Sequence, residues 1–249
     1  METLACHEEA FEIIVGGSGA SPVLITCEHA SNRLPDPWQW PEEDTWIRDL
    51  HWAWDIGADA LTRGLAESLS ATAVASRFTR LLIDANRSLD MKSLFRKETE
   101  GRAVHLNASI TDEERSRRIE GYWRPYHHAI DQCIDTIRPS LVLAIHSYTP
   151  VFEGEVRDVE MGVLHSGQPE LAGWWYQALD QATEMDVRID EPYSGANGFM
   201  YSPDIHAAIA DCPAIELEIR QDIVGDPTQR PELIRAIADV TRRFLARGR

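Results

Sequence analysis

Residues 22–35 read PVLITCEHASNRLP, an apolar run that ends in a glutamate, a histidine and an asparagine and then breaks at a proline. A short apolar run bounded by turn residues is typical of a buried strand. Two later apolar runs, Leu141–Ile145 and Ala214–Ile215, also lead directly into polar groups, HSY and ELEIR respectively. Open α/β sheets bind their ligands beyond the carboxyl ends of the strands, so these polar groups mark a candidate site.

Helical patterns alternate with these strands along the chain. Helical spacing of apolar residues occurs at 44–69, 111–137, 169–184 and 231–245, and further strands are expected at 71–78, 81–84 and 162–164. This alternation predicts an α/β fold with a mixed, mainly parallel sheet sandwiched between helices. We expect one domain over residues 1–249, with the glycine-rich residues 1–20 as a flexible lead-in, and residues 191–203 as a long functional loop.

The composition excludes several kinds of partner. The formal net charge of −17 repels nucleic acid and anionic membranes, and it means that an anionic substrate would need arginines of its own. No apolar run approaches the ~20 residues of a membrane span, and the acidic N-terminus does not resemble a signal peptide. Four widely spaced cysteines are expected to be reduced thiols in a cytoplasmic protein: Cys6, Cys27, Cys133 and Cys212. A small molecule is therefore the expected partner.

Two histidines at strand ends, His29 and His146, predict a metal site if their strands are parallel neighbours. Imidazole and carboxylate suit catalytic zinc, which takes three protein ligands and keeps one position open. The candidates for the third ligand are Glu28, Asp49, His51 and Asp55. Glu28 and His29 point to opposite faces of an extended segment, so they cannot easily bind one ion. His51 and Asp55 share one face of the expected helix, where a solvent-facing pair is the alternative.

Glu216 and Glu218 lie two positions apart on one face of an expected strand, where repulsion would raise the pKa of one carboxyl. A glutamate with a near-neutral pKa beside a metal-bound water is a good general base, whereas simple pairing with Arg220 is the alternative. A separate cluster of arginines (Arg77, Arg80, Arg87) with Asp84 and Asn86 could clamp a carboxylate, or could form internal ion pairs instead.

Five segments, taken in order, resemble the N-formylglutamate amidohydrolase family: EHASNRLP, HWAWDIGADAL, SRFTRLLIDANR, LAIHSYTP and AIELEIRQD. They extend from about Val23 to Asp222. The family is related in fold to the zinc-dependent carboxypeptidases and aspartoacylases, which have a mixed eight-stranded sheet between helices and one catalytic zinc. The resemblance therefore implies a zinc-dependent exopeptidase-like fold.

The resemblance also implies roles for particular residues. His29 and His146 match the metal histidines, and the segment around Glu218 matches the one that carries the general base. The related carboxypeptidases have a glutamate ligand where this chain has Asn32, whereas the formylglutamate family has an aspartate near the position of Asp55. Asp55 is therefore the expected third ligand of a Zn²⁺ ion, with His51 or Glu28 as replacements.

The implied reaction is hydrolysis of the amide of an N-acyl acidic amino acid such as N-formyl-L-glutamate, giving formate and glutamate. Glu218 and Arg87 are the expected catalytic residues, and Arg87 also holds the substrate carboxylate. The expected substrate contacts are Arg80, Asn86, Arg87, Tyr148 and Arg220. Because EHAS replaces a PH-containing segment of the histidine-degradation enzymes, another N-acyl amino acid or a small peptide amide is an alternative substrate. A ligand-binding homologue without catalysis is a further alternative.

Overall fold

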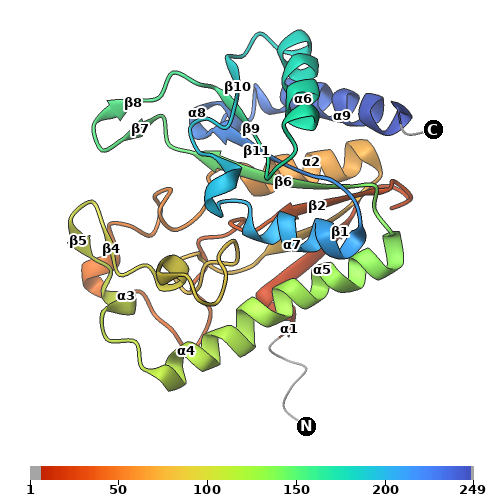
Figure 1. Ribbon diagram of the computed structural model, residues 1–249. Helices are drawn as coiled ribbons and strands as arrows, with labels where there is room; N and C mark the ends of the chain where they lie inside the picture. Colours follow the sequence, from red (N-terminus) through yellow and green to blue (C-terminus); the bar gives the residue numbers. More distant parts are fainter. Residues whose placement is uncertain (1–6, 248–249) are drawn as a thin grey trace.

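The computed structural model describes residues 7–247. A seven-stranded sheet forms the middle layer, in the order β1-β3-β2-β6-β11-β9-β10 (Figure 1). The strands are β1 (Phe11–Val15), β2 (Val23–Cys27), β3 (Thr72–Ser76), β6 (Leu141–Tyr148), β9 (Met161–Leu164), β10 (Val187–Ile189) and β11 (Ala214–Arg220). Four of the strand pairings are parallel, and two, β1 with β3 and β9 with β11, are antiparallel. The prediction of a mixed, mainly parallel sheet between helices is confirmed.

Helices cover both faces of this sheet (Figure 1). They are α1 (His7–Ala10), α2 (Ala58–Leu69), α4 (Asp112–Arg118), α5 (Arg124–Ile137), α6 (Pro169–Ala182), α7 (Tyr201–Ala210), α8 (Gln221–Val224) and α9 (Arg230–Arg247). Helices α2, α6 and α9 bury their apolar residues against one face, in a cluster that includes Ile25 and Leu143. Helices α5 and α7 cover the other face, over Leu24 and Val142. The apolar strands are thus buried from both sides, as their lack of alternation indicates.

Short elements complete the described chain. Two small hairpins, β4–β5 (Glu98–Thr99 with Arg102–Ala103) and β7–β8 (Val151–Phe152 with Glu155–Val156), extend from the same end of the molecule (Figure 1). The remaining pieces are α3 (His105–Ala108), 3-10 turns at Glu42–Asp44, Lys92–Phe95 and Gly195–Asn197, and a π-helical turn at Ile119–Trp123 between α4 and α5. No helix between residues 7 and 247 is both long enough and apolar enough to cross a membrane.

Four expectations of secondary structure are wrong. Residues 11–15 belong to an edge strand that pairs with β3, and not to a flexible lead-in. Residues 44–57 form turns, and α2 begins only after Gly57, whose φ of 87° and close approach to the backbone of Val224 suit glycine alone. Residues 81–84 form a buried loop whose apolar side chains pack into the core without joining the sheet. The eighth strand that the resemblance implied is absent from the sheet of residues 7–247.

The cysteines of the described chain are unpaired. Cys27, Cys133 and Cys212 are free thiols, as expected, and Cys6 lies outside the described residues. Burial raises the pKa of Cys212 to about 11, and burial likewise raises the pKa of Cys133. These thiols are therefore protonated and unreactive near neutral pH.

Candidate metal and hydrolytic site

The three strands that lead into polar residues are neighbours in the sheet. Strand β2 pairs in parallel with β6, and β6 pairs in parallel with β11, so their carboxyl ends meet at one edge. In this register Glu218 lies beside His146 on adjacent strands, and His29 follows the end of β2. The expected convergence of these strand ends is confirmed.

His29, Asp55 and His146 form a buried cluster at this edge. The Nδ1 atom of His146 lies 2.9 Å from Asp55 Oδ2, and the Nδ1 atom of His29 lies 3.4 Å from the same oxygen. One ligand atom from each residue lies within 4.8 Å of the others, so a single ion could contact all of them. The backbone N–H of Asp55 donates to the carbonyl of His29 at 2.9 Å, which holds the turn against the strand end.

A second carboxylate holds the far side of each imidazole. The Nε2 atom of His29 lies 2.7 Å from Asp84 Oδ1, and the Nε2 atom of His146 lies 3.0 Å from Glu28 Oε2. A proton on Nε2 that is donated to these carboxylates leaves the lone pair of each Nδ1 facing Asp55. Histidines that bind zinc are oriented by carboxylates in this way, so the donor set fits a catalytic zinc ion.

The carboxylates around the histidines are ionised. Burial raises the pKa of Glu28, but its contacts with His146 outweigh burial and bring the pKa to about 2. Burial also opposes ionisation of Asp55 and Asp84, yet the nearby imidazoles and Arg80 hold the pKa of both carboxyls below its ordinary value. Although burial opposes it, Glu216, Asp55 and Glu28 hold the pKa of His146 well above its ordinary value, so the cluster favours a positive charge at this point, either a proton on the imidazole or a bound cation.

Glu216 and Glu218 face the same space from β11. Burial raises the pKa of Glu218 to about 7 and that of Glu216 to about 8, and the charge of Glu218 adds to the effect on Glu216. Burial is thus a larger cause than the repulsion expected between the two. Within the described chain, neither Glu218 Oε2 nor Glu216 Oε2 has a hydrogen-bond partner, although Glu216 Oε2 lies 3.6 Å from His146 Nε2.

These groups line a cavity of about 390 Å³, within the range of roughly 300–1,000 Å³ that is usual for small-molecule sites. The cavity contains every predicted metal ligand and catalytic residue, together with Arg80, Asn86 and Tyr148. The lining includes Tyr193 and Phe199 from the loop expected to be functional at 191–203. Other lining residues come from irregular segments and the two small hairpins and had not been foreseen: Trp52, Arg96, Glu98, Glu100 and Phe152. Their segments lack the periodicity that would have drawn attention to them.

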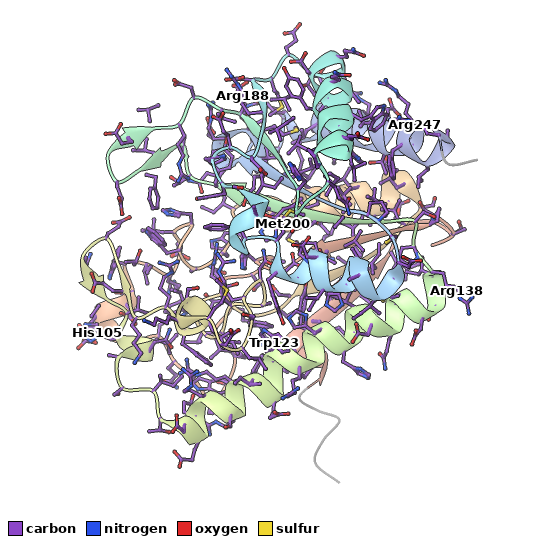
Figure 2. The ribbon with its side chains drawn as sticks, in the orientation of Figure 1. His105, Trp123, Arg138, Arg188, Met200 and Arg247 are labelled. Carbon is purple, nitrogen blue, oxygen red and sulfur yellow. The ribbon has the colours of Figure 1, made fainter. Side chains whose placement is uncertain are left out.

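The arginines differ in their surroundings. Arg80 forms ion pairs with Asp55 at 3.1 Å and with Asp84 at 3.5 Å. Arg87 donates from NH1 to the backbone carbonyl of Asn86 at 2.7 Å and lies over the ring of Phe199. Trp123, labelled in Figure 2, donates from Nε1 to the carbonyl of Arg87 at 3.0 Å and so anchors its backbone.

Arg220 does not reach the cavity, contrary to the expectation that it contacts substrate. Its guanidinium pairs with Asp222 at 2.8 Å and with Glu160 at 3.4 Å, at the end of β11 where the chain turns into α8. The remaining NH1 group donates to the carbonyl of Asp158. These partners satisfy Arg220 outside the site.

Asn86 and Tyr148 line the cavity but use their polar atoms elsewhere. The Asn86 amide donates to the carbonyl of Phe199 at 2.5 Å and accepts from the N–H of Ser202 at 2.9 Å. Asn86 therefore holds the segment that leads into α7. The Tyr148 hydroxyl donates to the carbonyl of Val159, which leaves its ring as the cavity wall.

The other candidates for the third ligand lie outside the cluster. Asp49 is exposed and accepts hydrogen bonds from Arg48 and Asn32. Glu28 lies behind His146, and His51 lines the cavity beside Trp52. Burial and the charge of Arg80 lower the pKa of His51 to about 4, so its imidazole is neutral. Among these candidates, only Asp55 joins the two histidines in the described structure.

The fold and the site together define a class of protein: an α/β domain whose strand ends carry a candidate metal centre, a poised glutamate and arginines around one small cavity. The sequence profile of the N-formylglutamate amidohydrolase family matches residues 21–224, and the chain belongs to that family. This membership agrees with the resemblance found in the sequence.

Curated and structural relatives agree with this assignment. The chain is 28% identical over 233 residues to an N-formylglutamate deformylase of Pseudomonas putida, covering 85% of this chain and 84% of the relative. A gene product of Agrobacterium tumefaciens of known structure superimposes with a TM-score of 0.87 at 27% identity, over 97% of each chain. The N-formylglutamate amidohydrolase of Ralstonia eutropha has a TM-score of 0.64 at 20% identity, over 97% of this chain and 100% of its own, and shares the fold.

Proposed function

We propose that the chain is a zinc-dependent amidohydrolase that cleaves the amide of N-formyl-L-glutamate, or of a closely similar N-acyl acidic amino acid. The products from the formyl substrate are formate and glutamate. The observation that carries the proposal is the buried cluster of His29, Asp55 and His146 at the wall of a cavity that also contains Glu218 and Arg87. The names of the curated Pseudomonas relatives, both N-formylglutamate deformylases, support the choice of substrate.

His29 Nδ1, His146 Nδ1 and the Asp55 carboxylate would hold the ion. Zinc held in this way lowers the pKa of a coordinated water towards ~7 and polarises a carbonyl oxygen. Glu28 and Asp84 keep the two imidazoles in the required orientation through their Nε2 atoms. Because His29, Asp55 and His146 are buried, the low dielectric also strengthens the charge interactions among them.

Glu218 is the proposed general base and acid. Its pKa of about 7 allows the carboxylate to accept a proton from the attacking water, and allows the resulting carboxyl to donate that proton to the leaving amide nitrogen. Glu218 is also the more accessible of the two β11 glutamates, with 7% of its surface exposed against 1% for Glu216. A protein that only binds its ligand has no need of such a base.

The arginines have separate proposed roles. Arg87 has no acidic partner of its own within the described chain, so its guanidinium is available to hold a substrate carboxylate. Arg80 is held in place by Asp55 and Asp84 next to the histidines, where it can stabilise negative charge that develops on the carbonyl oxygen. Arg220 is left out of the mechanism because its partners lie outside the cavity.

The test is to measure the zinc content of the purified protein and its release of formate from N-formyl-L-glutamate, before and after a chelator. We expect about one zinc ion per chain, loss of activity on chelation, and recovery when zinc is returned. A panel of N-acetyl-L-glutamate, N-formyl-L-methionine and small dipeptides would identify a different amide substrate. Full activity without metal would contradict the zinc dependence, and binding without any turnover would contradict the enzymatic function.

A further inference from the structure

The cavity contains another arginine that no acidic side chain neutralises. Arg96 follows the 3-10 turn Lys92–Phe95 and lines the cavity together with Arg80 and Arg87. Its guanidinium carbon lies 5.1 Å from the centroid of the Trp52 ring. Between residues 7 and 247, no carboxylate lies within ion-pair distance of Arg96, in contrast to the paired Arg80.

The acidic residues closest to this part of the cavity are engaged elsewhere or exposed. Glu100 accepts a hydrogen bond from Trp52 Nε1 at 2.8 Å, and Asp84 is paired with His29 and Arg80. Glu98 and Glu153, which also line the cavity, are exposed. Burial, together with the charges of Arg80 and Arg87, lowers the pKa of Arg96, so the protein itself leaves this guanidinium short of negative charge.

Arg87 and Arg96 occupy different parts of the cavity. Arg87 is close enough to the cluster for its charge to act on Asp84 and on Glu216. Arg96 lies over Trp52, whose ring also contacts Phe152 of the β7–β8 hairpin, at the side formed by the small hairpins. The cavity thus presents two guanidinium groups without ion pairs: Arg87, whose charge acts on Glu216, and Arg96, which lies over Trp52 beside the small hairpins.

An N-acyl glutamate has two carboxylates, one close to the amide bond that is cleaved and one farther from it. Its α-carboxylate is attached to the carbon that bears the amide nitrogen, so it lies close to the bond that is cleaved. Its side-chain carboxylate lies farther along the molecule. A guanidinium binds a carboxylate through two parallel hydrogen bonds, and the partly buried guanidinium of Arg96 has no such partner of its own.

We propose that Arg96 is the specificity-determining residue that binds the side-chain carboxylate of the substrate, while Arg87 binds the α-carboxylate. This role rests on the proposed function and deepens it, because it makes N-acyl dicarboxylic amino acids the substrate class. A neutral side chain in the same place would leave Arg96 without a counter-charge.

The test compares N-formyl-L-glutamate with its neutral isostere N-formyl-L-glutamine, in the wild type and in the variants Arg96→Gln and Arg87→Gln. We expect the wild type to prefer the glutamate substrate by at least about 30-fold in kcat/KM, and Arg96→Gln to reduce that preference by about tenfold or more. Arg87→Gln should lower kcat/KM for both substrates by similar factors. Arg102→Gln, which changes an exposed arginine stacked on Trp46 outside the cavity, is the matched control and should keep the preference.

Calorimetric binding of both compounds to zinc-loaded protein with Glu218→Gln provides a readout that does not need turnover. We expect the same preference for the charged ligand, and its loss when Arg96→Gln is added. A preference that survives Arg96→Gln, an equal loss for both compounds, or no preference in the wild type would overturn the role of Arg96. Thermal unfolding shows whether each variant folds. If Arg96→Gln does not fold, Arg96→Lys takes its place, because lysine keeps the charge without the planar fork, and it should also reduce the preference for the charged ligand.

The two proposals fail in different ways. Turnover of N-formyl-L-glutamate without any effect of Arg96 on the preference would leave the proposed function standing and remove this role. A charge preference in binding that depends on Arg96, without turnover of any N-acyl amino acid, would retain the carboxylate subsite and remove the proposed function.

Discussion

The central strands and the irregular segments around them contribute to the candidate site by different means. Strands β2, β6 and β11 present His29, His146 and Glu218 at their ends, and their positions follow from the backbone ladder of a parallel sheet. The residues that face them across the cavity, Asp55 and Arg80, belong to segments without regular structure. The strand side of the site is therefore positioned by the regular backbone hydrogen bonds of the sheet, and the loop side by single hydrogen bonds between segments.

The irregular side is held by a small number of long-range contacts. The N–H of Arg80 donates to the carbonyl of Ala53 at 3.1 Å, and the Thr79 hydroxyl donates to the same carbonyl at 2.8 Å. The N–H of Thr79 donates to the carbonyl of Arg33 at 2.7 Å. Because each contact joins segments that are distant in sequence, the loss of one can displace a functional side chain without unfolding the sheet. Substitutions on the two sides test this comparison through their effects on activity, zinc binding and stability.

The largest effect is expected on the strand side, from Glu218→Gln. The amide cannot accept the proton of the attacking water, so kcat should fall by about 10³-fold while the zinc content is unchanged. The matched variant Glu216→Gln, two positions earlier on β11, should lose considerably less activity. Measurement of kcat and of bound zinc for both variants checks the assignment, and a greater loss in Glu216→Gln would transfer the role of base to that residue.

The two carboxylates behind the histidines allow a direct comparison of the strand side with the loop side. Glu28→Gln just after β2 and Asp84→Asn in the 81–87 loop each replace the carboxylate that accepts one imidazole Nε2 proton with a neutral amide, which is a weaker acceptor and can also turn its NH₂ group towards the ring. Each should weaken zinc binding by about 10–100-fold, measured by competition with a chelator. Asp59→Asn, which changes a half-buried aspartate paired with Arg63 on α2, is the control and should bind zinc normally. Unchanged affinity in either buried variant would show that this carboxylate does not orient its histidine.

Thr79→Val tests the individual contacts of the loop side. The substitution leaves the buried carbonyl of Ala53 with one donor fewer, and removes the acceptor of the Leu81 N–H. We expect a loss of about 1–2 kcal/mol in the free energy of unfolding, with a fall in kcat/KM because Asp55 and Arg80 flank this contact. Thr45→Val removes an equivalent but exposed hydrogen bond to the carbonyl of Glu42, and should change stability by less than about 0.5 kcal/mol. Chemical denaturation of both variants makes the comparison.

The smallest effect is expected from the support beneath the 84–87 loop. His127 Nε2 lies 3.1 Å from the carbonyl of Ala85, and its Nδ1 lies 2.8 Å from His206 Nε2. His206 in turn pairs with Asp131. Burial, with a contribution from the charge of His206, lowers the pKa of His127 to about 3. The folded state therefore keeps His127 neutral.

A histidine whose pKa is lower in the folded than in the unfolded state makes stability fall as the pH drops from about 6.5 towards 3, since the unfolded chain takes up the proton first. His127→Gln cannot be protonated, so its stability should change less over this range, by about 1 kcal/mol between pH 7 and pH 5.5. Denaturation curves at the two pH values provide the measurement. His128→Gln, which changes the exposed neighbour on α5, is the control, and equal pH dependence of all three proteins would rule out a role for His127.

Apart from the edge strand β1, the wrong predictions of secondary structure concern the irregular segments. Helical spacing of Ile47, Leu50 and Trp54 predicted a helix, but Ile47 is buried in a small cluster of tryptophans built around turns. Apolar periodicity reports which residues become buried, and a compact loop can bury the same residues as a helix. His51 and Asp55 therefore reach the cavity without sharing a helical face.

The substrate contacts show the same distinction. Arg220 has the same parity along β11 as Glu216 and Glu218, yet it pairs with Asp222 because the strand ends there and the chain turns into α8. Arg96 lies in a segment with no clear period, and only the folded chain brings it over Trp52 and into the cavity. Neither placement follows from local spacing, because each depends on where a segment ends or what it packs against.

The sequence by itself determined the central strands, most of the long helices, and the identity of the groups at the strand ends, because buried strands and amphipathic helices are encoded by neighbouring residues. It also limited the third metal ligand to four candidates. Only the tertiary structure decided that Asp55 joins His29 and His146, that Glu28 and Asp84 stand behind them, and that Arg96 rather than Arg220 faces the cavity. Those choices depend on single contacts between segments far apart in the chain, and such contacts leave no periodic pattern in the sequence.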